Sequence, residues 1–213
     1  MEKDNAEPAT SAVVGTVLLA AGNSSRLGRP KQLLPLGNNG QTLLRHAAEA
    51  AVASESSATI VVLGEEDENG ARMERELNGL PVQIVRNAMW REGMASSLRT
   101  GIHALRSWRK DVDAVVVLLC DQPHLTTDTL NALVGAHRTT QKPIVASQYE
   151  GGPGAPCLFY RSLFAELCSL SGGEGAKRVI LQHGDAVALV PFPEGALDID
   201  TPADVERVVR VIQ

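Results

Sequence analysis

The sequence predicts a single-domain α/β protein, a three-layer sandwich in which helices cover both faces of a mostly parallel β-sheet. Apolar runs rich in valine, isoleucine and leucine alternate along the chain with amphipathic segments of about ten to fifteen residues, which is the pattern of β-α-β units. The length of 213 residues suits one domain with a substantial core. No internal repeat or interdomain linker interrupts the alternation.

Each predicted strand is a short apolar run, and each predicted helix carries apolar residues at helical spacing. The nearly continuous run 13–20 is typical of a strand buried on both faces, and the most apolar run, 113–119, is expected at the centre of the sheet. Thr42 is a suitable N-cap for the first helix, and the glycine-rich segment 151–156 is expected to form a loop. The predicted strands are 13–20, 59–63, 82–85, 113–119, 143–147, 157–160 and 187–190, and the predicted helices are 41–54, 65–78, 92–108, 126–137, 162–169, 175–182 and 202–212.

The composition, 44% hydrophobic and 21% charged, is that of a soluble globular protein. A net charge of -5 argues against a nucleic-acid-binding surface, so we expect no nucleic-acid partner. No apolar run reaches the roughly 18 residues of a membrane span, so we expect no membrane partner. Three cysteines without Cys-x-x-Cys spacing predict no disulfide or zinc site and a cytoplasmic location. The polar residues 1–12 are expected to form a disordered N-terminal tail, which leaves 13–213 as the folded domain.

The loop after the first predicted strand has the features of a phosphate-binding loop. Gly22 and Gly28 are expected to adopt positive φ and allow a close approach to a ligand, while Arg26 and Lys31 supply positive charge. The spacing fits neither a Walker A loop nor a dinucleotide-binding fingerprint. The alternative is an ordinary glycine-rich connection between strand and helix.

Two acidic segments, 121 and 198–204, suit a magnesium site. Asp121 comes just after the central run 113–119, where the carboxyl ends of parallel strands bind ligands, and Mg²⁺ is usually held by one or two carboxylates. The alternative role for Asp121 is to cap the next helix. A second ligand is expected from Asp198 or Asp200, because the start of the last helix explains Thr201 and Asp204 but not these two acids before it.

A third polar segment, 87–98, runs from the third predicted strand into a helix N-terminus, which favours anionic groups. Gly93 and Ser97 are expected at the same edge of the sheet as the phosphate loop. Ser97 either contacts the ligand or only caps the helix. Trp90 is expected to pack and Met94 to lie in the core.

Four motifs together resemble the MobA-like nucleotidyltransferases, with the molybdenum cofactor cytidylyltransferases as the nearest branch. They read LAAGxSxRxGxxK in residues 19–31, NxxWxxGMxxS in 87–97, CDQP in 120–123 and DxDTPxD in 198–204. The resemblance implies a Rossmann-like domain of the nucleotide-diphospho-sugar transferase type over residues 13–213. It also implies transfer of a nucleoside monophosphate from an NTP, here CTP, to a phosphorylated acceptor, here molybdenum cofactor or molybdopterin, with release of pyrophosphate.

The residues and the resemblance together give a candidate site with Mg²⁺ as its cofactor. The implied partner proteins are molybdoenzymes or cofactor-delivery proteins. Ala21, in the cytidylyl form of the loop, predicts a preference for CTP over GTP of roughly ten- to a hundredfold. The expected catalytic residues are Lys31, Arg26 and Asp121; the metal ligands are Asp121 and Asp200; the nucleotide-binding residues are Leu19, Ala20, Ala21, Gly22, Ser24, Ser25, Arg26, Gly28, Lys31, Gly93 and Ser97.

Other functions remain compatible with the same residues. A GTP-using enzyme or a sugar-phosphate nucleotidyltransferase needs the same phosphate loop and acidic pair, and a non-catalytic NTP-binding regulatory protein needs the loop alone. The segment Gly154-Ala155-Pro156 departs from the Gly-His-Pro or Gly-Asn-Pro of many cofactor cytidylyltransferases, so it lacks a polar side chain that the resemblance implies for the acceptor.

Overall fold

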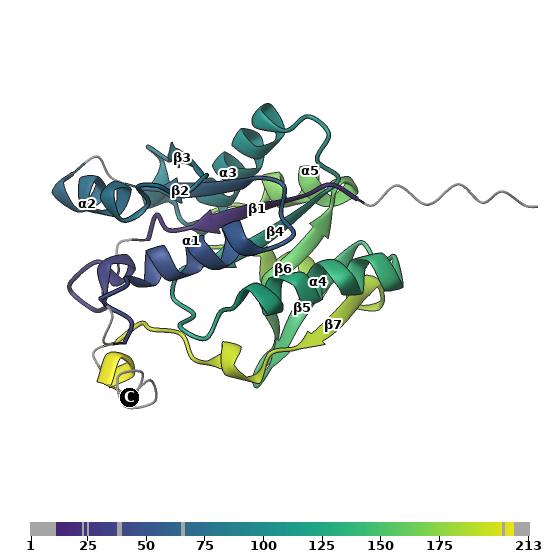
Figure 1. The fold of residues 1–213 in the computed structure, drawn as a ribbon. Coiled ribbons are helices and arrows are strands. Elements are labelled where there is room, and N and C mark those ends of the chain that lie inside the picture. The colour runs from purple at the N-terminus through teal and green to yellow at the C-terminus, as the bar shows by residue number, and fades with distance from the viewer. Residues whose placement is uncertain are drawn as a thin grey trace, which may run out of the picture.

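The computed structural model describes residues 12–22, 24, 26–37, 40–64, 67–201 and 203–206. Its sheet has seven strands in the order β3-β2-β1-β4-β6-β5-β7, in which only β6 runs antiparallel to its neighbours. The predicted central strand, β4, has three strands on each side (Figure 1). The mostly parallel sheet predicted from the sequence is therefore confirmed.

The strands follow the apolar runs closely. All six residues of β1 and all five of β2 are buried, because helices cover both faces of the sheet. β1 pairs with β2 and β4 in parallel, so Val17 lies between Ile60 and Val117. The strands are β1 (Val14–Leu19), β2 (Thr59–Leu63), β3 (Gln83–Arg86), β4 (Ala114–Leu119), β5 (Ile144–Tyr149), β6 (Gly152–Tyr160) and β7 (Val187–Pro191).

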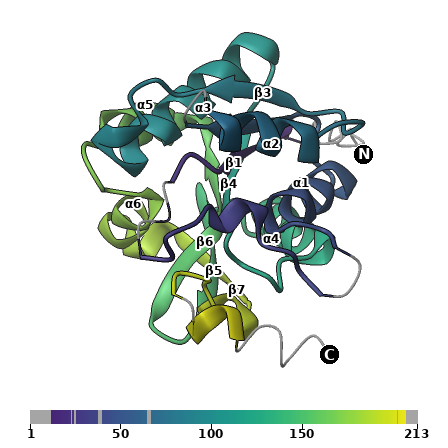
Figure 2. The ribbon, with the colours of Figure 1, turned by 90° about the vertical axis from the view of Figure 1, so that its left-hand side faces the viewer.

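Helices α1, α2 and α4 pack on one face of the sheet, and α3, α5 and α6 pack on the other (Figures 1 and 2). Thr42 caps α1 as predicted, since its hydroxyl accepts a hydrogen bond from the Arg45 amide at 3.2 Å. The helices are α1 (Leu43–Ala53), α2 (Glu68–Glu76), α3 (Met94–Trp108), α4 (Thr127–Thr140), α5 (Phe164–Ser169) and α6 (Ala176–Gln182). None of the helices in the described segments is long and apolar enough to cross a membrane.

Helix α3 lies in very close contact with β1. A Cβ atom on Gly101 would collide with the Val17 side chain, and one on Gly15 would lie 2.6 Å from a Leu105 methyl carbon. Glycine at both positions therefore lets the helix approach the strand. This contact fixes the N-terminus of α3 beside the carboxyl end of β1, where the candidate site lies.

Several boundaries differ from the sequence prediction by two residues or more, and two of these differences lie next to the candidate site. The segment 151–156 is mostly strand. Strand β6 begins at Gly152, which pairs with Tyr149 at the end of β5, and the antiparallel pairing continues from there. A short 3-10 helix, η2 (Trp90–Glu92), precedes α3, which starts at Met94 rather than at 92. Of the predicted last helix, residues 203–206 are helical, and the rest lies outside the described residues, as does 1–11 of the predicted tail.

Candidate active site

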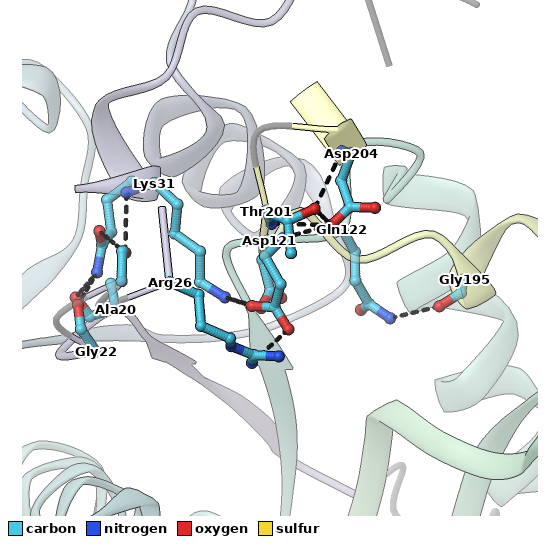
Figure 3. A network of polar contacts seen from close by, with 12 residues as sticks. Ala20, Gly22, Arg26, Lys31, Asp121, Gln122, Gly195, Thr201 and Asp204 are labelled. Atoms are coloured by element: carbon cyan, nitrogen blue, oxygen red, sulfur yellow. Dashed lines mark hydrogen bonds and ion pairs between the residues drawn. The ribbon is translucent and has the colours of Figure 1, made fainter. Parts of the chain in front are cut away.

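The candidate site is an ionic cluster at the carboxyl edge of the sheet (Figure 3). The Lys31 Nζ atom lies 2.6 Å from Asp121 Oδ2 and 2.8 Å from Asp200 Oδ1. Arg26 Nη2 lies 2.8 Å from the other Asp200 oxygen, Oδ2. The structure thus brings two carboxylates that are far apart in sequence to one ammonium group.

The contacts of the cluster favour the charged forms of Lys31 and Asp200. Burial by itself lowers the pKa of Lys31, but the charge of Asp121 and hydrogen bonds to Asp121 and Asp200 outweigh burial and raise the pKa. The hydrogen bond from Lys31 lowers the pKa of Asp200. Side-chain exposure is 15% for Lys31, 12% for Asp121 and 34% for Asp200, so the contact to Asp121 is the better shielded from water.

Asp121 follows β4 after one residue, Cys120, and is held by its own backbone. Its carbonyl oxygen accepts a hydrogen bond from the Ile199 amide at 3.0 Å, which brings the acidic segment 198–200 alongside. Its Oδ1 atom is buried and has no hydrogen-bond partner among the described residues. A buried acceptor of this kind can serve a bound cation. Cys120 itself is no nucleophile, because burial raises the pKa of its thiol to about 12.

Asp200, rather than Asp198, shares the Lys31 ammonium. Asp204 accepts hydrogen bonds from the Thr201 amide at 2.8 Å and from the Thr201 hydroxyl at 2.7 Å, which orients the turn that carries Asp200. Asp198 is exposed as a residue, but its carboxylate is partly desolvated. This desolvation and the charge of the nearby Asp121 carboxylate raise the pKa of Asp198 to about 6. The two carboxylates at Lys31 are therefore the better fit for a metal.

A buried glutamine, Gln32, organises the phosphate loop. Its side-chain amide donates to the carbonyl oxygens of Ala20 at 2.9 Å and Gly22 at 2.7 Å. The Ser24 hydroxyl accepts a hydrogen bond from the Lys31 amide at 3.0 Å. Sequence reasoning missed Gln32, and its only signal was a polar residue directly before the apolar stretch 33–36.

The expected loop conformation is partly wrong. Gly28 has φ +72°, as predicted, but Gly22 does not adopt positive φ, and Ser24 does at 51°. Gln32 binds the carbonyl oxygens of Ala20 and Gly22 in this part of the loop, and the left-handed conformation comes at Ser24, two residues after Gly22. A Cβ atom on Gly22 would meet no atom within 4 Å, so its outer face is open. Ser25 lies outside the described residues.

A cavity of about 420 Å³, here the central cavity, adjoins the ionic cluster. Ser24, Arg26 and Gly28 do not line it, although they were expected in the site. The predicted residues that line it are Leu19, Ala20, Ala21, Gly22, Lys31, Gly93, Ser97 and Asp121, and the other lining residues are Gln32, Trp90, Arg91, Met94, Leu119 and Cys120.

The wall made by the start of α3 depends on Asn87, which sequence reasoning did not single out. Its buried amide donates to the Ser96 hydroxyl at 2.8 Å and to the Ser97 hydroxyl at 3.0 Å. Ser97 therefore supports the wall as well as lining the cavity. Met94 was expected in the core but is 41% exposed, because it is the first residue of α3 and projects over the cavity against Gly175.

A second buried glutamine, Gln122, was also missed, although it belongs to the CDQP motif. Its amide donates to the carbonyl oxygens of Ala155 at 3.0 Å and Gly195 at 3.1 Å, which joins the end of β4 to β6 and to the short 3-10 helix η5 (Pro193–Ala196) (Figure 3). It thereby fixes the backbone next to Asp121.

Asp121 and Asp200 could together hold a divalent cation. The unpartnered Asp121 Oδ1 atom fits this role, and hard carboxylate oxygens are the ligands that Mg²⁺ prefers. Within the described residues no group of three or more His, Cys, Asp or Glu side chains is placed to hold a metal. Two carboxylates leave coordination positions for phosphate oxygens.

The fold and the site define a nucleotide-binding α/β protein, and comparisons with known proteins agree. A family model, the MobA-like NTP transferase domain, matches residues 16–187. The purine catabolism protein PucB of Bacillus subtilis (strain 168) is 30% identical over 205 residues, which cover 92% of this chain and 96% of PucB. The nicotine blue oxidoreductase of Paenarthrobacter nicotinovorans is 33% identical over 205 residues, which cover 92% of this chain and 95% of that protein.

Among solved structures, Rv0371c from Mycobacterium tuberculosis H37Rv in complex with manganese has a TM-score of 0.71 and 27% identity, and the match covers 93% of this chain and 99% of that one. This chain belongs to the MobA-like NTP transferase family, a family of nucleotidyltransferases.

Proposed function

We propose that this protein transfers a cytidylyl group from CTP to a phosphorylated acceptor of the molybdenum cofactor type, with release of pyrophosphate. The observation that carries the proposal is the contact of Lys31 with both Asp121 and Asp200 beside the central cavity. A phosphate loop, a cation and two carboxylates at one edge suit a triphosphate and a divalent ion.

In the proposed reaction, an oxygen of the acceptor phosphate attacks the α-phosphorus of CTP, and the bond to pyrophosphate breaks. Lys31 and Arg26 offset charge on the triphosphate and on the departing pyrophosphate. A phosphomonoester has a second pKa near 6, so the acceptor is already a dianion at neutral pH. No general base is needed for this attack.

Asp121 and Asp200 would hold the divalent cation, and the manganese bound by the related Rv0371c supports such a site. When bound, Mg²⁺ supplies Lewis-acid stabilisation of negative charge on the phosphates. The exposed Arg26 fixes the outer oxygen of Asp200, and Ile199 holds the backbone of Asp121. These contacts orient both carboxylates before substrate binds.

The experiment that tests the function is a panel of CTP, GTP, ATP and UTP against molybdopterin, molybdenum cofactor and sugar 1-phosphates, with pyrophosphate release as readout. The expected result is release with CTP and molybdopterin or molybdenum cofactor, dependent on Mg²⁺ or Mn²⁺. Release with a sugar phosphate alone would replace the acceptor in the proposal. Binding of NTP without pyrophosphate from any acceptor would indicate a regulatory protein.

A redox reaction is the second candidate, since a 33% identical relative is named an oxidoreductase. The same phosphate loop could receive the pyrophosphate of a dinucleotide. Oxidation of NADH or NADPH with nicotine blue as electron acceptor, measured by absorbance on the same preparation, separates the two functions. Dinucleotide oxidation without pyrophosphate release would favour the redox reaction.

A further inference from the structure

The ionic cluster is balanced in charge without any bound ion. Two cations, Lys31 and Arg26, face two carboxylates, Asp121 and Asp200, at 2.6 to 2.8 Å. The field of each of these two carboxylates is already offset by a cation, so they attract a divalent cation less than two free carboxylates would, while Asp198 and Asp204 add negative charge nearby. Of the four carboxylate oxygens, Asp121 Oδ1 alone lacks a hydrogen-bonding partner within the described part of the chain.

The Lys31 ammonium lies between the two carboxylates that a metal would share. Both contacts are short, so a divalent ion cannot bridge Asp121 and Asp200 while the ammonium stays there. The ammonium would also repel such an ion. Lys31 must therefore leave this position before both carboxylates can bind metal.

The side chain of Lys31 can move while its backbone stays in place. The Lys31 amide is bound to the Ser24 hydroxyl, and the next residue, Gln32, is anchored to Ala20 and Gly22. The side chain lines the central cavity, and a lysine stem has four flexible carbons. A triphosphate in the cavity offers this ammonium more negative charge than the two carboxylates do.

We propose that Lys31 masks the metal ligands: it holds Asp121 and Asp200 until a nucleoside triphosphate draws its ammonium away, so that the nucleotide binds before the divalent cation. This inference rests on the proposed function for the nature of the metal site. It assigns Lys31 a role in the order of binding in addition to phosphate neutralisation. By linkage, nucleotide and metal then strengthen each other's binding.

Binding of Mn²⁺ to the nucleotide-free protein, followed by the EPR signal of free Mn²⁺, tests the masking directly. Lys31→Met removes the charge at similar length, Lys31→Arg keeps a charge, and Lys110→Met is a control at an exposed lysine outside the site. We expect Lys31→Met to lower the Kd for Mn²⁺ at least tenfold, and the other two variants to leave it within about twofold. The double variant Lys31→Met/Asp121→Asn should lose the increase in Mn²⁺ affinity.

Equal Mn²⁺ affinity in the wild type and Lys31→Met would overturn the masking, as would a gain that survives Asp121→Asn. A second measurement needs no variant: calorimetry of CTP and GTP binding to the wild type in EDTA. Masking requires that the preferred nucleotide binds without metal, and binding only in the presence of Mn²⁺ would overturn it.

The two proposals fail in different ways. If Lys31→Met gains Mn²⁺ affinity but no acceptor yields pyrophosphate, the masking stands and the proposed reaction is wrong. If the wild type turns over CTP but the wild type and Lys31→Met bind Mn²⁺ with equal affinity, the proposed reaction stands and the masking is wrong. For the same Lys31→Met variant we expect turnover to fall about 10²- to 10³-fold while metal binding tightens, because one preorganised phosphate contact is lost.

Discussion

A buried lysine is costly unless its charge is paired, and Lys31 meets this condition with two carboxylates. Removing either partner leaves the other group partly buried without its counter-charge. The same contacts that keep Lys31 charged also hold Asp121 and Asp200 next to the central cavity. The residue is therefore both the main cation of the site and the link between its two acidic segments.

The substitution Asp121→Asn tests the metal role of this residue. The amide keeps the size of the side chain but loses its charge, so metal-dependent pyrophosphate release should fall below detection while Tm changes by only a few degrees. The Ile199 contact is made by the backbone and remains. Turnover at the wild-type rate in Asp121→Asn would refute the assignment.

The substitution Ala21→Gly tests base selection. Ala21 is buried at the wall of the central cavity, and under the proposed function its methyl group would take space that a purine base needs. A methyl-sized difference is worth about 1–3 kcal/mol, so the wild type should prefer CTP over GTP by roughly ten- to a hundredfold. Competition assays should show a smaller ratio in Ala21→Gly. An unchanged ratio would move selectivity to the loops after β2 and β3.

At the scale of the element, the start of α3 depends on one glycine. Gly93 has φ +117°, and a Cβ atom there would collide with the carbonyl oxygen of Gly172. Gly93→Ala should destabilise the protein by about 1–3 kcal/mol and weaken nucleotide binding, as measured by denaturant unfolding and calorimetry. Gly135→Ala, on α4 with open space around it, is the matched control and should stabilise by about 0.5–1 kcal/mol.

Helix α1 carries a histidine whose titration is coupled to stability. Burial lowers the pKa of His46, and its Nε2–H donates to the Leu125 carbonyl oxygen at 2.8 Å. Unfolded histidine titrates near pH 6.5, so below this pH the unfolded chain binds a proton that folded His46 binds less readily. The free energy of unfolding therefore falls as pH decreases. The drop in Tm from pH 7.5 to 5.5 should be smaller in His46→Gln, and an equal drop would contradict this coupling.

The elements could be predicted because a parallel sheet is buried on both faces. Strands β1, β2 and β4 are continuous apolar runs, so their boundaries fall within one residue of the prediction. The start of β6 could not be predicted, because Gly152 to Pro156 has turn composition and becomes strand only through pairing with β5. Tertiary pairing overrides local preference there.

The convergence of Asp121 and Asp200 could be predicted from the sequence. The roles of the buried side-chain amides could not. Asp121 and Asp200 stand in motifs with a chemical meaning of their own. Three buried side-chain amides donate hydrogen bonds to groups that only the fold brings near them. Gln32 and Gln122 bind backbone carbonyl oxygens, and Asn87 binds a serine hydroxyl. Asn87 and Gln122 do stand in two of the quoted motifs, but a motif does not say which carbonyl or hydroxyl group each amide binds.

At the scale of the whole molecule, a nucleotide should stabilise the domain as a unit. The central cavity is lined by β1, β4 and the start of α3, which lie in the middle of the fold. At a nucleotide concentration of about 100 times Kd, the gain is about 2.7 kcal/mol. In a domain of this size Tm should rise by roughly 5–10 °C. Thermal unfolding with each NTP should show the largest rise with CTP, and no rise with any NTP would contradict a nucleotide site.

One hydrogen bond, from the Ile199 amide to the Asp121 carbonyl oxygen, brings the second carboxylate to a site otherwise built from the first two thirds of the chain. The region that matches the family model ends at 187, before Asp198 and Asp200. The segment that carries the proposed second metal ligand therefore lies outside the sheet, and exchanges there can change the site without changing the sheet. A chimera that exchanges only the residues after β7 should therefore alter the metal site and keep the sheet in place.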